Sequence, residues 1–233
     1  PVFPILWENK KNNVAIEGYK EKGFLPEAFI NMLAFLGWNP GDKKEIFSIK
    51  ELIEEFSLER VGKSGARYDY QKTKWFNQQH LRLKSNKEIL QKMNFSQSSQ
   101  KDEEYLLKVV DLVKERCVFF DDIIKESTYL FKAPQSYDQS AVEKKWNEET
   151  VAHLISLKSE FSLCKEFTRN NLEHIFKSYL DSSQVGFGKV MPGLRISITG
   201  KMQGPSMFSV MELLGLKEVI NRIDNALDKL GNG

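Results

Sequence analysis

The chain has 233 residues, of which 41% are hydrophobic and 28% charged, and its formal net charge is +2 at pH 7. This is ordinary globular composition, sufficient for one large domain or two to three small ones. Two distant cysteines and three histidines without ligand spacing argue against a disulfide framework or a zinc site, and no apolar run approaches the roughly 20 residues of a membrane span.

The cellular setting is predicted from the same features. Few cysteines and no disulfide pattern favour a reducing compartment. The first residues, PVFPILWENKK, lack the basic lead and small-residue cleavage site of a signal peptide. We therefore expect a cytoplasmic protein without membrane contact.

Charge is distributed unevenly along the chain. Residues 60–92 hold nine Lys and Arg against two acidic residues, whereas residues 100–128 hold five against eight. A local excess of basic residues is typical of a surface that binds a polyanion, most commonly a nucleic acid. A solvated basic face on a helical protein is an equally acceptable interpretation of this composition.

The first part of the chain predicts short helices. LPEAFINMLAFLGW has Pro26 at a first helical position and a glycine stop at Gly37, and the apolar residues at helical spacing are Phe29, Ile30, Leu33 and Leu36. Ser48 and Glu51 match a capping box at the start of the next helix. Asp69 is the expected cap of QKTKWFNQQHLRL, a helix that places two lysines and a tryptophan close together.

The middle of the chain continues in helices. Residues 103–132 predict two helices, whose inward residues are Leu106, Val109, Val110 and Val113 on the first and Phe120, Ile123 and Ile124 on the second. Residues 140–160 and 164–180 predict two more. The Gly, Ser and Pro content of residues 181–193 predicts a loop.

Two helices, SMFSVMELLG and LKEVINRIDNALDKL, are expected to close the chain, and no strand pattern is longer than RISIT. The predicted class is therefore mainly α.

No catalytic constellation is recognisable in the chain. The nucleophile elbow GxSxG, the zinc motif HExxH and the phosphate loop are missing. His80, His153 and His174 are far apart and read as structural histidines. The pair of glycines in GFGKVMPG lacks the strand, third glycine and acid of a dinucleotide site.

The stretch PGLRISITGKMQGPSMFSVMELLG, residues 192–215, is the strongest candidate for a binding site. Between Gly186 and Pro205 there are no acids, and the cations are Lys189, Arg195 and Lys201. The stretch leads into a helix starting near Pro205, whose free N–H groups suit phosphate or the edges of an unstacked base. The alternative is a tight turn with Met202, Met207 and Phe208 in the core.

Three ordered strings carry a resemblance to a known family. They are IEGYKEKGFLPEAFINMLAFLGWNPGD, SIKELIEEFSLERVGKSGARYDYQKTKWFNQQHLR and LRISITGKMQGPSMFSVMELLGLKEVINRIDNAL. Together they resemble the C-terminal half of bacterial-type glutamyl-tRNA synthetase, a class I aminoacyl-tRNA synthetase. The resemblance covers nearly the whole chain and is weakest over residues 84–160. Glutaminyl-tRNA synthetase ends in β-barrels, against which the helical C-terminal part argues.

The resemblance implies a mainly α fold, a stem-contact helical region followed by two α-helical anticodon-binding domains of the helix-cage type. Residues 1–80 would form the end of the catalytic-loop region and the stem-contact domain. Residues 81–145 would form the first anticodon-binding helical domain, and residues 146–233 the C-terminal one.

The resemblance also implies which residues contact tRNA. Those expected at the tRNA stem are Lys72, Lys74, Trp75 and Arg82. Arg116 matches an arginine that reads the third anticodon base. Those expected around the first two bases are Arg195, Thr199, Met202, Gly204, Pro205, Met207 and Phe208. Gly204 departs from the family, where Thr or Ser is common.

The family's activity is the ATP-dependent charging of tRNA with glutamate, with Mg²⁺. This chain lacks the HIGH signature, and the stretch from Lys11 to Val14 lacks the SKR of the lysine loop. The resemblance therefore implies no catalytic residue, metal or cofactor in this chain, which is not expected to aminoacylate alone. The expected partner is a glutamate tRNA bound by a monomer. The alternative is a non-catalytic helical tRNA-binding or protein-interaction module derived from a synthetase.

Overall fold

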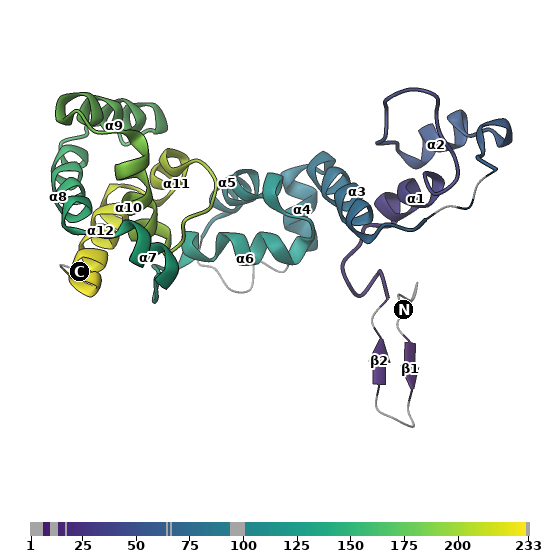
Figure 1. Ribbon diagram of the computed structural model, residues 1–233, viewed down its shortest axis with the longest axis horizontal. Coiled ribbons are helices and arrows are strands. Elements are labelled where there is room, and N and C mark those ends of the chain that lie inside the picture. The colour runs from purple at the N-terminus through teal and green to yellow at the C-terminus, as the bar shows by residue number, and fades with distance from the viewer. Residues whose placement is uncertain are drawn as a thin grey trace. The chain divides into compact units, whose positions relative to one another are not determined.

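The computed structural model describes residues 7–9, 14–16, 18–63, 65, 67–93 and 101–231, and the elements in these ranges are mainly helices (Figure 1). Contacts divide the described residues into two compact units. The first contains the described part of Pro1–Gln97 together with Lys114–Lys125, and the second the described part of Ser98–Val113 together with Glu126–Gly233. These two units leave the division into three domains as a prediction.

The first unit begins with a short antiparallel pair of strands, β1 (Trp7–Asn9) and β2 (Val14–Ile16). Its helical elements are α1 (Pro26–Ala34), α2 (Ile49–Glu55), the 3₁₀ turn η1 (Leu58–Arg60), α3 (Tyr70–Leu83), α4 (Asn86–Lys92), the 3₁₀ turn η3 (Lys114–Arg116) and the beginning of α6 (Phe120–Phe131). The predicted helix starts are confirmed: Ser48 and Glu51 form a capping box, and Asp69 accepts hydrogen bonds at the start of α3.

The buried face of α1 is not the predicted one. Ile30 and Leu33 are 41% and 46% exposed, whereas the buried residues of the helix are Ala28, Asn31 and Met32. The helix also ends at Ala34, before the predicted glycine stop. The prediction was wrong because it followed hydrophobicity alone, while a buried amide fixes the rotation of this helix.

Asn31 links three parts of the first unit. Its Nδ2 donates to the carbonyl of Glu45 at 3.1 Å, and its Oδ1 accepts from the N–H of Phe47 at 2.9 Å. The same oxygen lies 3.0 Å from Nε2 of His80 on α3. Burial lowers the pKa of His80, so the imidazole is neutral over a wider pH range and can donate to this oxygen. This network holds α1, α3 and the intervening chain together.

The second unit is a packed set of helices. Its elements are α5 (Glu103–Val113), the end of α6, α7 (Gln139–Lys145), α8 (Glu148–Ser162), α9 (Arg169–Ser183), α10 (Phe187–Thr199), α11 (Met207–Leu214) and α12 (Leu216–Leu230). The predicted pair of helices over residues 103–132 is confirmed, and the four predicted inward residues of α5 are buried. Residues 140–160, predicted as one helix, form parts of α7 and α8.

The helix α10 corrects one prediction, because a loop was expected over residues 181–193, and it also contains RISIT, the longest strand pattern noted in the sequence. Residues 187–199 are helical, with Pro192 inside the helix. α10 packs against α7, α8 and α12. Most of its residues from Val190 to Thr199 are buried. Burial against three helices outweighs the intrinsic penalty of proline in a helix, about 3 kcal/mol.

Arg222 on α12 is 2% exposed and joins the ends of two other helices. Its Nη1 donates to the carbonyls of Tyr129, in the last turn of α6, and Ile198, in the last turn of α10, at 2.6 and 3.0 Å. Its Nε pairs with Glu218 at 2.7 Å. Because last-turn carbonyls have no partner within their own helix, one guanidinium satisfies two helix ends.

Gly193 is the point of closest approach between α10 and α8. A Cβ at this glycine would lie 2.3 Å from Cγ2 of Thr150. The Thr150 side chain is held in place because its hydroxyl donates to the carbonyl of Lys145 at 2.8 Å. We therefore expect Gly193→Ala to lower the free energy of unfolding by about 1–3 kcal/mol, measured by urea denaturation.

Two variants make this prediction specific. Thr150→Ser removes the obstructing methyl and keeps the hydroxyl, so it should restore most of the stability lost in Gly193→Ala. Gly188 lies in the same helix with nothing within 4 Å of its Cβ position. Gly188→Ala should be neutral or stabilise by up to about 1 kcal/mol. A Gly193→Ala variant as stable as Gly188→Ala would contradict the close approach.

Candidate nucleic-acid interface

The loop between α10 and α11, residues 200–206, is fastened at both ends. Gly200 adopts the left-handed conformation with φ of 74°, and its carbonyl accepts from the N–H of Asp138 at 2.9 Å. Thr199 Oγ1 donates to the carbonyl of Arg195 at 2.8 Å, and the N–H of Lys201 donates to the same hydroxyl at 3.3 Å. These bonds fix the turn that leaves α10.

Arg195 holds the far end of this loop. Its Nη2 donates to the carbonyl of Pro205 at 2.8 Å. A Cβ at Gly204 would lie 2.8 Å from Nη1 of the same guanidinium. The departure from the family at Gly204 therefore has a structural counterpart, since the arginine occupies the space that a side chain at this position would take.

The predicted residues of this stretch divide into buried and accessible ones. Thr199, Met207 and Phe208 are only 4%, 2% and 8% exposed, and Phe208 packs edge-on against Phe176. Met202, Gly204, Pro205 and Arg195 are partly buried. The exposed side chains of the loop are Lys201, Gln203 and Ser206. Lys201 is one of the cations counted in the candidate stretch, but none of the three was among the residues expected around the first two anticodon bases. Burial by tertiary packing is the signal that the sequence alone lacked.

A hollow of about 600 Å³ lies beside the loop, between its first residues and the chain that follows α6. Its lining combines the rings of Tyr129, Pro134 and Tyr137 with the exposed lysines Lys132 and Lys201. Burial raises the pKa of the Tyr137 phenol, so this group stays a neutral hydrogen-bonding hydroxyl at physiological pH. Aromatic side chains together with lysines are the residue types that bind an unstacked base and its phosphate.

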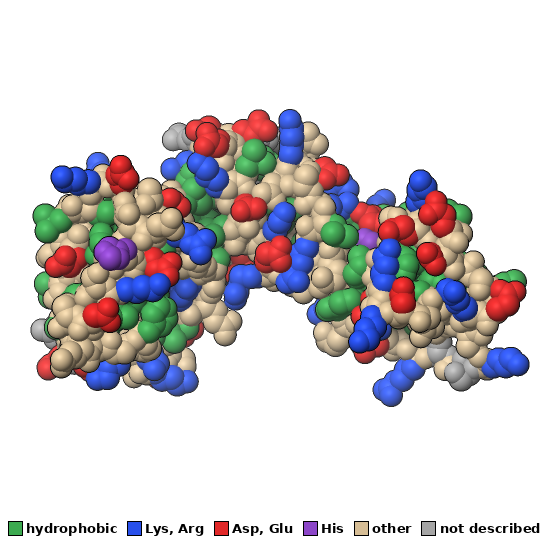
Figure 2. Space-filling view, turned by 90° about the horizontal axis from the view of Figure 1, so that it is seen from above, with side chains coloured by type: hydrophobic (Ala, Val, Ile, Leu, Met, Phe, Trp, Pro, Cys, Tyr) green, Lys and Arg blue, Asp and Glu red, His purple; other side chains and the backbone are tan. Residues whose placement is uncertain are grey.

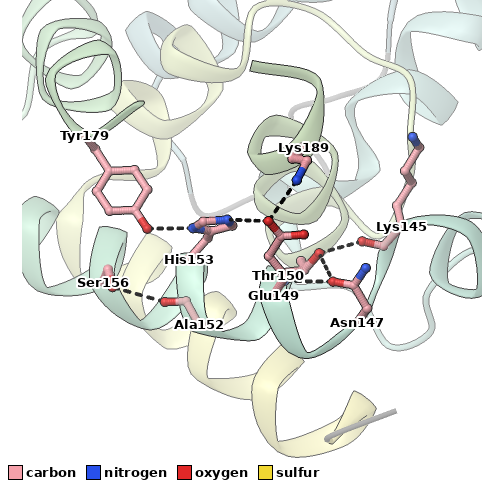
Figure 3. Close-up of polar contacts among 9 residues, drawn as sticks. All are labelled: Lys145, Asn147, Glu149, Thr150, Ala152, His153, Ser156, Tyr179 and Lys189. Carbon is pink, nitrogen blue, oxygen red and sulfur yellow. Dashed lines mark hydrogen bonds and ion pairs between the residues drawn. The ribbon is translucent and has the colours of Figure 1, made fainter. Parts of the chain in front are cut away.

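Lys189, one of the cations counted near this loop, is engaged elsewhere. It lies in the first turn of α10, and Figure 3 shows its ammonium pointing to Glu149 on α8, at 3.0 Å. The same carboxylate lies 3.7 Å from Nε2 of His153, whose Nδ1 is 2.7 Å from the hydroxyl of Tyr179. This cluster joins α8, α9 and α10, and its carboxylate offsets the charge of Lys189.

Arg116 belongs to the first unit, in the turn η3, and its side chain is exposed. The flanking residues are anchored: Cys117 is fully buried, and Arg82 of α3 contacts Glu115 through both its carboxylate and its carbonyl. The structure thus brings Arg82 and the Arg116 turn together within the first unit.

The remaining predicted stem residues lie on α3. Lys72 pairs with Glu45 at 2.8 Å and lies over the ring of Phe76, and Lys74 lies 5.1 Å from the centre of the Tyr70 ring. Trp75 is 36% exposed. Ring contacts orient these cations while part of each side chain stays accessible, because long basic side chains place their apolar stems on the surface.

The face of the molecule drawn in Figure 2 carries side chains of both signs of charge. On the face shown in Figure 2, basic and acidic side chains alternate without an uninterrupted basic patch. Among the basic residues of 60–92, Lys72, Arg82 and Lys84 each pair with a different acidic residue, so they offer separate cationic contacts. Such contacts suit individual phosphates along a nucleic-acid backbone.

Within the described ranges, no helix is long and apolar enough to cross a membrane. The same residues contain no group of three or more His, Cys, Asp or Glu placed to hold a metal ion. The predicted lysine-loop position, Lys11 to Val14, lies outside the described residues except for its last member.

Two family models match the chain. The model described as "Anticodon binding domain" matches residues 71–227, and the model described as "tRNA synthetases class I (E and Q), catalytic domain" matches residues 9–75.

Two relatives with curated names illustrate what the chain is similar to. The chain is 43% identical over 233 residues to a glutamate–tRNA ligase of Flavobacterium psychrophilum. This alignment covers 99% of the chain and 46% of the relative. A glutamate–tRNA ligase of Porphyromonas gingivalis is 35% identical, with the same two coverages. The chain thus spans about half the length of the curated relatives it matches.

A solved structure agrees with these matches. The crystal structure of a glutamate tRNA ligase from Elizabethkingia meningosepticum, in complex with its amino acid, is 40% identical with a TM-score of 0.87. The match covers 99% of this chain and 46% of that one.

Proposed function

The chain belongs to the family described by the anticodon binding domain model, and from this premise we propose that it is the tRNA-binding part of a glutamate–tRNA ligase. In this proposal the full-length enzyme charges a glutamate tRNA in the cytoplasm, with ATP and Mg²⁺. Residues 1–80 contact the stem, while residues 81–145 and 146–233 recognise the anticodon in a monomer. No step of the charging chemistry is assigned to residues of this chain.

The fastened loop at residues 200–206 carries the proposal. It starts at the buried Thr199, ends at the buried Met207, and is tied across by the bond from Arg195 to the carbonyl of Pro205. Between these anchors it exposes Lys201 and Gln203. A loop held in one conformation loses little entropy on binding, which favours selective recognition of single-stranded bases.

The proposed recognition has two physically different parts. Lys72, Lys74 and Trp75 contact the stem, where cations neutralise phosphates irrespective of sequence. Arg116 reads the third anticodon base, and the loop with the adjoining hollow holds the first two. The buried Thr199, Met207 and Phe208 act by shaping the loop, and its exposed polar groups make the contacts.

The test is equilibrium binding of the chain to transcripts of a glutamate tRNA, with the anticodon intact and with each anticodon base changed. Arg116→Ala should remove preference for the third base, a loss of about 1–3 kcal/mol, because one arginine–base contact is worth this much. Lys72→Ala should weaken all transcripts about equally and reduce the salt dependence by about one released counterion.

Each variant is the control of the other, because both remove one exposed cation. Equal weakening of every transcript by Arg116→Ala would reduce its role to phosphate binding. Binding that ignores the anticodon and disappears with salt would contradict anticodon recognition altogether. That result would support the alternative in which the chain is a helical module with a basic surface, and binding to protein partners would then be tested.

A further inference from the structure

The side chain of Arg82 holds the turn that carries Arg116 through an ion pair and hydrogen bonds to Glu115. Nε of Arg82 lies 3.1 Å from Oε2 of Glu115 and donates to the main-chain carbonyl of the same residue, also at 3.1 Å. Its Nη2 donates to that carbonyl as well. Two nitrogen atoms of one planar group thus converge on the residue directly before Arg116. Such a fork fixes direction as well as distance.

Two other side chains of α3 hold the same turn. Nε2 of Gln78 donates to the carbonyl of Glu115 at 3.4 Å, and Nδ2 of Asn77 donates to the carbonyl of Val118 at 2.5 Å. Cys117, between these points, is fully buried. The backbone is therefore fixed before and after Arg116, whose own side chain is exposed.

We propose that Arg82 is a positioning residue that sets the direction of Arg116, and that it acts through Glu115 and not by contacting the tRNA stem. This inference rests on the proposed role of Arg116 in reading a base. The side chain of Arg82 is 34% exposed, and its Nε and Nη2 donate to Glu115. Two of its three nitrogen atoms are thus committed to Glu115, whereas Lys72 makes one ion pair, to Glu45, and has 46% of its side chain exposed.

The arrangement joins stem contact to base reading within one unit. Lys72 and Trp75 lie in the first half of α3 and Arg82 lies near its end. A straight helix transmits position between its two ends, so a stem seated on the first half of α3 presents Arg116 at a fixed place. If the turn were mobile, the position of Arg116 relative to the first half of α3 would vary. Selectivity falls when the side chain that recognises a ligand is poorly held.

Two substitutions distinguish positioning from stem contact, because the two roles predict different results. The third-base preference is the Kd for a glutamate tRNA transcript with a changed third anticodon base divided by the Kd for the intact transcript. If Arg82 positions Arg116, Arg82→Ala should lower this preference by about tenfold and leave preference for the first two bases unchanged. Glu115→Ala keeps the carbonyl to which Arg82 donates and removes only the carboxylate contact, so it should lower the same preference by a smaller factor.

If Arg82 instead binds phosphate, Arg82→Ala should weaken all transcripts equally. Glu115→Ala would then remove the carboxylate contact and a nearby negative charge, so it should strengthen binding of all transcripts. Either of these results would overturn the inference. Arg82→Lys supplies a further check, since a lysine can reach one acceptor but cannot reproduce the fork, and should restore only part of the preference.

A measurement without tRNA separates this inference from the proposed function. Hydrogen–deuterium exchange of the amides at residues 115–118 should be faster in Arg82→Ala than in the original chain, while exchange in α12 should be unchanged. Unchanged exchange at residues 115–118 would contradict the claim that Arg82 fixes the backbone of this turn. A different combination is faster exchange in Arg82→Ala together with an unchanged third-base preference in Arg116→Ala. That result would support the fixing of the turn by Arg82 and contradict the proposed role of Arg116 in reading a base.

Discussion

Replacing Arg222 by Met is expected to lower the free energy of unfolding by about 3–5 kcal/mol, the usual loss when one member of a buried charged network is removed. The variant fills a similar space but supplies no donor. The carbonyls of Tyr129 and Ile198 lose the bonds that Arg222 donates to them, and Glu218 loses its cation. Because these carbonyls end two different helices, both helix ends should loosen together.

Urea denaturation followed by circular dichroism measures the loss. Arg222→Lys keeps the charge but has one nitrogen atom in place of the separate Nε and Nη1 donors, so it cannot reach all three acceptors and should fall between the original chain and Arg222→Met. Arg169→Met is the matched control at an exposed arginine and should change stability by no more than about 0.5 kcal/mol. A loss below about 1 kcal/mol in Arg222→Met would contradict the shared capping role.

Replacing Gly200 by Ala is expected to cost about 2–5 kcal/mol. Gly200 has a φ of 74°, and an L-residue in this conformation costs roughly 1–2 kcal/mol. A Cβ here would also lie 2.9 Å from the carbonyl oxygen of Ser136 and 3.0 Å from Cβ of Pro134. The oxygen belongs to the backbone and cannot rotate away, so overpacking adds about 1–3 kcal/mol.

The chain offers its own control for the conformational part of this loss. Gln184 ends α9 with a φ of 53° and is exposed, so a non-glycine residue already occupies the left-handed conformation there. The stability difference between Gln184→Gly and Gln184→Ala measures the φ cost without a clash. If Gly200→Ala loses no more than this difference, the close contact with Ser136 is contradicted.

Features that depend on neighbouring residues, such as helix caps, were predicted better from the sequence than the packing between helices was. The capping box at Ser48, the cap at Asp69 and the buried stripe of α5 depend on residues within one or two turns, and all are confirmed. α10 was missed because its Gly and Pro content is unfavourable until α7, α8 and α12 surround it. The face of α1 was missed because Asn31 finds its partners on distant segments.

The candidate site shows the same limit. The resemblance named Arg116 and the stretch around Arg195, but side-chain accessibility is a property of the folded chain. Arg195 bonds to Pro205, while Lys201 and Gln203 face solvent. The resemblance placed Arg82 at the stem, and only its contacts with Glu115 in the folded chain suggest another role.

The placement of Lys114–Lys125 has a consequence for dissecting the molecule. This segment belongs to the first unit, although the stretches on both sides of it belong to the second. No single cut in the chain therefore yields either unit intact. A fragment that stops at Val113 lacks the turn with Arg116, and one that starts at Glu126 lacks α5. A series of deletions would therefore disrupt both units at once and could not assign the proposed stem contact and the proposed base recognition to separate segments. Point substitutions are the appropriate tool for this chain.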